Sequence, residues 1–118
     1  MKNLEQIRAA EAINSAKDLD RAAVNKLPAM ILTNGLLATV AFCNPESSSG
    51  KNRPAMTKAM ERTAKYLATQ GLNRAANQGL KEFAEDLSSR DSVHLQRTTE
   101  EALAFIGYLR RFAKNNEQ

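Results

Sequence analysis

Cysteine and histidine are almost absent from this chain: its 118 residues include one cysteine, Cys43, and one histidine, His94. A single cysteine cannot form an intrachain disulfide or a cysteine-based zinc site, and a single histidine excludes a metal site built from several histidines. The sequence therefore predicts no disulfide framework and no metal site. Its scarcity of cysteine fits a reduced, cytoplasmic setting.

Motifs for catalysis and for nucleotide cofactors are also missing. The chain contains neither GxGxxG nor GxxxxGK[ST], and nothing organises a Ser-His-Asp triad around His94. Serines 47–49 lie in a segment of loop composition, without the strand-turn-helix elbow that exposes a nucleophile. The chain is therefore expected to be no enzyme and to use no cofactor. Several carboxylates have basic neighbours on predicted helical faces and are expected to be solvated: Glu82, Glu85, Asp86, Glu100 and Glu101.

Aromatic residues make up only 5% of the chain, and tryptophan is absent, which leaves little material for stacking on nucleobases. If the protein binds nucleic acid, we expect it to hold phosphates and to leave base recognition to another component. The N-terminus lacks the apolar stretch of a signal peptide, and no segment is long enough to cross a bilayer. The sequence therefore predicts a protein without a membrane partner.

The chain is long enough for one domain, residues 1–118, and 42% of its residues are hydrophobic. Its formal charge of +4 is unevenly distributed. Lys and Arg balance Asp and Glu in residues 1–46, five against five, whereas residues 47–81 hold seven against one, and residues 82–118 hold five against seven. The basic middle segment attracts polyanions, of which nucleic acid is the commonest. A solvated face that serves solubility is the alternative.

Apolar residues recur with helical spacing, and no stretch shows the period of two that is typical of strands. The sequence therefore predicts an all-α fold, a single-domain bundle of about five helices. We expect these helices in residues 2–25, 28–42, 54–70 and part of 72–88, with a last helix that begins at Asp91-Ser92 or at Thr98. Residues 44–53 are rich in Ser, Pro, Gly and Asn and are predicted to form a flexible loop.

The apolar segment 28–42 is predicted to be the central helix, buried on all sides by the others. Pro28 would occupy its first turn, and Asn44-Pro45 would end it. Asn34-Gly35 is unusual in a helix centre, because glycine costs about 1 kcal/mol there relative to alanine. We expect Gly35 to allow close approach of a neighbouring helix, and Asn34 to form a buried hydrogen bond across that contact.

A basic stripe follows in the predicted helix 54–70. Lys58, Arg62 and Lys65 share one face with Thr69, opposite the apolar side chains, and should face solvent or a ligand. These cations are predicted to contact phosphates, together with others that flank them or lie in neighbouring helices: Lys51, Arg53, Lys17, Arg21, Arg110 and Arg111. For the basic residues near the end of the last helix, favourable interaction with the helix dipole is the alternative.

Two motifs resemble a known family. The first is L-P-x-M-I-x-x-N-G-L in residues 27–36, and the second is T-E-E-A-L-A-F followed by L-R-R-F in residues 99–112. Their order and spacing resemble the small, all-helical subunit of the type III-B CRISPR effector, the Cmr complex of the RAMP module. Gly107-Tyr108 departs from the family, which often has a larger residue followed by Trp.

The resemblance implies a non-catalytic subunit in antiviral defence, present in several copies that stack as a filament. Its implied partners are copies of itself, the RAMP backbone subunits, a large polymerase-like subunit, and the guide and target RNA whose channel it would line. Two alternatives unrelated to CRISPR remain: a helical protein-interaction module, and a helical nucleic-acid-binding regulator. Against the regulator, the sequence offers no compact helix pair with a polar second helix suited to a major groove.

Overall fold

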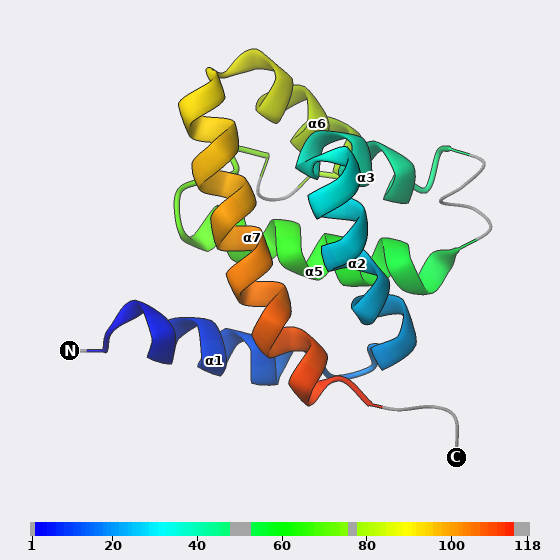
Figure 1. Ribbon diagram of the computed structural model, residues 1–118, viewed down its shortest axis with the longest axis vertical. Helices are drawn as coiled ribbons and strands as arrows, with labels where there is room; N and C mark the ends of the chain where they lie inside the picture. Colours follow the sequence, from blue (N-terminus) through cyan, green and yellow to red (C-terminus); the bar gives the residue numbers. More distant parts are fainter. Residues whose placement is uncertain (1, 48–52, 76–77, 115–118) are drawn as a thin grey trace.

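The computed structural model describes residues 2–47, 53–75 and 78–114. Within these ranges the chain is all-α, as predicted, and contains no strand. Six helices are described rather than about five (Figure 1): α1 (Leu4–Ser15), α2 (Arg21–Asn34), α3 (Leu36–Cys43), α5 (Pro54–Thr69), α6 (Leu80–Ser89) and α7 (Ser92–Phe112). Half of the predicted flexible loop 44–53, residues 48–52, lies outside the described residues.

The prediction of one helix across residues 2–25 is wrong, because the chain breaks between α1 and α2. Asp18 adopts a left-handed backbone conformation with φ of 68°, which asparagine and aspartate tolerate better than most residues. Two residues later, Asp20 is the N-cap of α2, and its carboxylate accepts the Ala22 N–H at 3.3 Å. The break thus arises from aspartate turn and capping chemistry, without glycine or proline.

The predicted central helix 28–42 is also wrong in its boundaries. Pro28 lies inside α2, not at a helix start, and the segment is divided at Gly35 into α2 and α3. Gly35 has φ of 92°, and no heavy atom lies within 4 Å of the position that a Cβ would occupy. The backbone conformation at this position therefore requires glycine. Close approach of another helix is not the reason. Asn34 is exposed rather than buried, and Leu32 is 74% exposed, so the segment is not enclosed on all sides.

The remaining helices lie near their predicted positions. Pro54 occupies the first turn of α5, and Gly71, with φ of 75°, follows its end as expected. The last helix begins at the earlier of the two predicted starts, because the Asp91 carboxylate caps it by accepting the His94 N–H at 2.9 Å. Thr98 is buried within α7 instead, where its hydroxyl donates to the His94 carbonyl.

Helix α7 organises the bundle by packing against α1, α2 and α5 (Figure 1). Tyr66 of α5 stacks on Phe105 of α7, with ring centroids 4.1 Å apart, at the centre of one continuous hydrophobic core. The radius of gyration, 13.2 Å, is close to the value of about 13.5 Å expected for a single folded unit of this length. No helix in the described ranges has the length and apolar character needed to span a bilayer.

Candidate nucleic-acid interface

Most of the predicted phosphate-binding cations come from three distant segments that meet at one corner of the molecule. The linker 16–20, between α1 and α2, joins the end of α7 by two backbone hydrogen bonds: Arg21 N–H donates to the Lys114 carbonyl at 3.0 Å, and Lys114 N–H donates to the Leu19 carbonyl at 3.2 Å. Side chains of α5 reach the same linker. We call the cations of these joined segments the basic corner: Lys17, Arg21, Lys58, Arg62, Lys65, Arg110, Arg111 and Lys114.

Two cations of the α5 stripe bind the end of α1. The Arg62 guanidinium donates to the carbonyls of Ser15 at 2.7 Å and Lys17 at 3.2 Å, and the Lys58 ammonium donates to the Asp18 carbonyl at 3.2 Å. Helix α1 has no basic residue in its own last turn. Because a helix C-terminus carries partial negative charge and unpaired carbonyls, α5 supplies the cations that α1 lacks.

Two more predicted cations hold the end of α7. Arg21 donates from Nε to the Ala113 carbonyl at 3.0 Å and from Nη2 to the Arg111 carbonyl at 3.4 Å. Arg110 donates to the side-chain oxygen of Asn25 at 3.1 Å. These contacts join the end of α7 to the start of α2, so both arginines contribute to the fold as well as to the charge of the surface.

The other cations of the basic corner are exposed and lack internal partners. The side chains of Lys17, Lys65, Arg111 and Lys114 form no hydrogen bond or ion pair with any residue that the structure describes. Lys65 also lines a groove of about 300 Å³ between α1 and α5, which holds Glu11 and Arg62 as well. These four residues are therefore the cations that are available to a polyanion.

Arg53 and Lys51 complete the predicted set. Lys51 lies outside the described residues, whereas Arg53 is exposed at the start of α5, with its guanidinium carbon 5.6 Å from the Phe42 ring centroid. Sequence reasoning did not include Lys26 or Lys114 in this set, although both are exposed. The signal for Lys114 was its position beside Arg110 and Arg111. For Lys26 the sequence offered no signal, because only the packing of α2 against α5 places it near Arg53.

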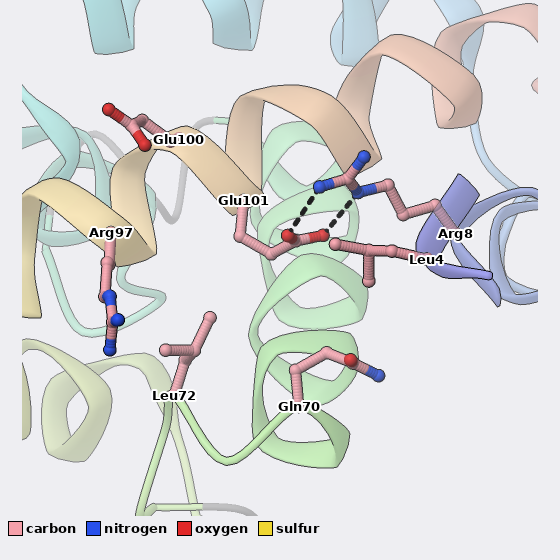
Figure 2. Close-up of a pocket in the computed structure, with 7 residues that line it drawn as sticks. All are labelled: Leu4, Arg8, Gln70, Leu72, Arg97, Glu100 and Glu101. Atoms are coloured by element: carbon pink, nitrogen blue, oxygen red, sulfur yellow. Dashed lines mark hydrogen bonds and ion pairs between the residues drawn. The ribbon is translucent and has the colours of Figure 1, made fainter.

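The prediction that Glu101 is solvated is wrong. Its carboxylate accepts hydrogen bonds from Arg8 Nε at 2.7 Å and Nη2 at 2.8 Å, and from the Tyr66 hydroxyl at 2.7 Å. Figure 2 shows Arg8 of α1 reaching this carboxylate, while the neighbouring Glu100 points away from it. The contact joins α1, α5 and α7, so the carboxylate connects three helices.

The network around Glu101 shifts the acidity of its members. Hydrogen bonding to Arg8 holds the pKa of Glu101 below its usual value against the opposing effect of burial, and the same bond raises the pKa of Arg8. Burial, and then the hydrogen bond to Glu101, raise the pKa of Tyr66. The network therefore holds a carboxylate anion, a guanidinium cation and a neutral phenol at neutral pH.

Two further carboxylates expected to be solvated have internal partners. Asp86 accepts from Arg90 Nε at 3.2 Å and from the Arg74 N–H at 3.0 Å, and Glu82 accepts the Gly79 N–H at 3.0 Å in front of α6. Glu85 and Glu100 are exposed as predicted. The partners of these acids are local, within twelve residues along the chain.

Neither the cysteine nor the histidine belongs to a group of metal-ligating residues. Burial raises the pKa of the Cys43 thiol to about 11, so the reactive thiolate is disfavoured. His94 lies between Arg90 and Thr98, with its Nδ1 3.2 Å from Arg90 Nη1 and its Nε2 3.3 Å from Thr98 Oγ1. Across the described residues, no group of three or more His, Cys, Asp and Glu side chains could hold a metal ion.

Together the fold and these contacts define a class: small all-α proteins in which segments rich in basic residues meet at one corner of the bundle. Comparison with known protein families identifies the family within this class. Residues 2–116 match the model of the family described as CRISPR-associated protein (Cas_Cmr5), and the chain belongs to this family. It is thus a small CRISPR-associated subunit of the type III-B complex, as its two motifs indicated. No curated protein and no solved structure matches the chain.

Proposed function

We propose that the chain is a non-catalytic subunit that stacks in copies within the type III-B effector and uses the basic corner to line the path of guide and target RNA. The supporting observation is the meeting of the α1–α2 linker, the start of α2, α5 and the end of α7 at the basic corner, where four cations are exposed and without partners among the described residues. Base pairing between the RNA strands supplies the sequence specificity, and the protein contributes charge and shape.

Two carboxylates that form ion pairs within the fold support a structural role for the chain. Glu101 is occupied by Arg8 and Tyr66, and Asp86 is occupied by Arg90. Because both carboxylates stabilise the fold, we assign neither to catalysis, and we assign the RNA cleavage of the complex to other subunits. The RAMP backbone subunits and the large polymerase-like subunit are the proposed protein partners.

The best test replaces the exposed cations and spares those that hold helix ends. In the assembled complex, Lys17→Ala/Lys65→Ala/Lys114→Ala should weaken RNA retention and lower the log–log salt slope by roughly 0.7 for each lost single-strand phosphate contact. Measuring RNA retention across a salt series checks this. Arg62 is left intact, because its loss would also release the end of α1.

A control variant removes three exposed cations from the other end of the bundle: Arg74→Ala/Lys81→Ala/Arg97→Ala. It changes the net charge equally and should leave the salt slope near that of the wild type. Equal effects of both variants would show that only total charge matters, and an unchanged slope in the first variant would remove the basic corner from the RNA path. Loss of assembly in nuclease-treated complex would favour a pure protein-interaction role.

A further inference from the structure

A concave site lies where α2 packs beside the first turn of α5, apart from the cations that hold helix ends. It has a volume of about 390 Å³, within the range of small-ligand pockets, and Lys26 and Arg53 both line it. Each is exposed, and neither side chain forms an ion pair or a hydrogen bond with any described residue. The lining includes one carboxylate, Asp20, whose Oδ1 accepts the Ala22 N–H. The site therefore has two available cations and one acid that is already used as a cap.

Among the basic residues that the structure describes, Arg53 is the one that lies over an aromatic ring. Its guanidinium lies over the ring of Phe42, with 5.6 Å between the guanidinium carbon and the ring centroid. An arginine held against an aromatic ring loses part of its rotational freedom and keeps its planar group oriented. Guanidinium planes are surfaces on which unpaired RNA bases stack. The low aromatic content of the chain therefore does not exclude base contact, because an arginine supplies the flat surface.

We infer that this site binds one nucleotide of single-stranded RNA, with the base stacked on the Arg53 guanidinium and the adjacent phosphate on the Lys26 ammonium. The inference rests on the proposed function and extends it from phosphate contact to base contact. Stacking of this kind is tolerant of sequence, because every base has a flat face. The site would hold an unpaired or displaced base of either strand without selecting its identity.

The test uses the full chain and two fluorescent RNAs of equal length: a normal single strand, and an abasic strand that keeps only the ribose-phosphate backbone. Arg53→Lys keeps the charge and removes the plane, so it should lower affinity for the normal strand by about two- to fivefold and leave affinity for the abasic strand unchanged. Lys26→Ala should weaken both strands alike and lower the salt slope by roughly 0.7.

Arg97→Lys is the matched control. Arg97 is an exposed arginine that lines a different cavity, with Gln70 just beyond the opposite end of α5, so the same substitution there should change neither affinity. If Arg53→Lys binds both RNAs as the wild type does, the base contact is overturned while the proposed function stands. If the wild-type chain binds neither RNA, the nucleotide site is overturned, and the salt series on the assembled complex decides the proposed function separately.

A second measurement identifies which strand supplies the base. In assembled complexes, 4-thiouracil is placed in the guide or in the target, and irradiation links it to nearby protein. A cross-link to peptides that contain Lys26 or Arg53 supports the site and names the strand. No cross-link to these peptides from either strand overturns it.

Discussion

At the scale of single residues, the same side-chain chemistry serves two purposes in this protein. Arg62 and Arg21 donate to helix-end carbonyls at 2.7 Å and 3.0 Å, whereas the side chains of Lys65 and Lys114 form no hydrogen bond or ion pair with the described residues. All four carry the same charge in segments of similar composition, so the sequence cannot separate them. Only the positions of distant carbonyls decide which cation is structural.

Glu101 leads to a prediction about pH. Its pKa is lowered in the folded state, mainly by the hydrogen bond to Arg8, so its ionised form stabilises the fold above the unfolded pKa of about 4.3. That contribution is lost as the pH falls below this value and through the lower folded pKa. Glu101→Gln should cost about 1–3 kcal/mol of unfolding free energy at pH 7 and less at acid pH. Urea unfolding at several pH values measures this.

Glu100→Gln is the control for that experiment, because Glu100 is exposed and lies outside the network. It should change the unfolding free energy by no more than about 0.5 kcal/mol. A wild-type protein and a Glu101→Gln variant that lose stability in parallel between pH 5 and pH 3 would contradict the assignment.

At the scale of elements, the junction between α2 and α3 depends on one backbone conformation. Gly35 has φ of 92° and ψ of 159°, a region that is almost restricted to glycine. Space is not the constraint, because no heavy atom lies within 4 Å of the position that a Cβ would take there. The chain can therefore turn from α2 into α3 without backbone strain only because glycine occupies this position.

Gly35→Ala should accordingly destabilise the fold by about 1–3 kcal/mol through backbone strain. Gly107→Ala is the matched control: Gly107 lies inside α7, and the position of its missing Cβ is equally open, with no heavy atom within 4 Å. There the higher helix propensity of alanine should stabilise the protein by roughly 0.5–1 kcal/mol. Chemical denaturation of both variants measures the two effects, and equal shifts of one sign would contradict the conformational explanation.

At the scale of the whole molecule, the bundle exposes large apolar side chains of the kind that form contacts between subunits. Leu32 near the end of α2 is 74% exposed, and Val93 at the start of α7 is 63% exposed. The end of α2 and the start of α7 both lie away from the α1–α2 linker, on the side of the molecule that holds α3 and α6 (Figure 1). These exposed apolar side chains could therefore contact other copies or subunits in the proposed stack, and they are separate from the basic corner.

Leu32→Glu tests this separation. Because Leu32 is exposed, the isolated variant should keep its unfolding free energy within about 0.5 kcal/mol of the wild type. Incorporation into the effector complex should fall, since a charge would be placed in an apolar contact. Co-purification with the other subunits measures incorporation, and Glu85→Lys serves as a control for a changed surface charge. Full incorporation of Leu32→Glu would exclude this end of the bundle from subunit contacts.

The all-α class, the position of α5 and membership of the family could be predicted from the sequence, and the start of α7 was one of two predicted starts, because these features depend on local signals. Helical periodicity, a first-turn proline at Pro54 and an N-cap at Asp91 act within a few residues. The break at Asp18 was also local, but the helical spacing of apolar residues continues across it, and no glycine or proline marks the turn.

Which charges remain available could be learned only from the packed bundle. Arg8 and Glu101 are 93 residues apart in sequence, and Arg62 lies 47 residues from the carbonyl of Ser15. Pairings of this range depend on how α1 crosses α5 and α7, and no periodicity within one helix specifies that crossing. A charged side chain is paired or available according to its neighbours in space. The basic residues could therefore be found from the sequence, but their division between fold and surface could not.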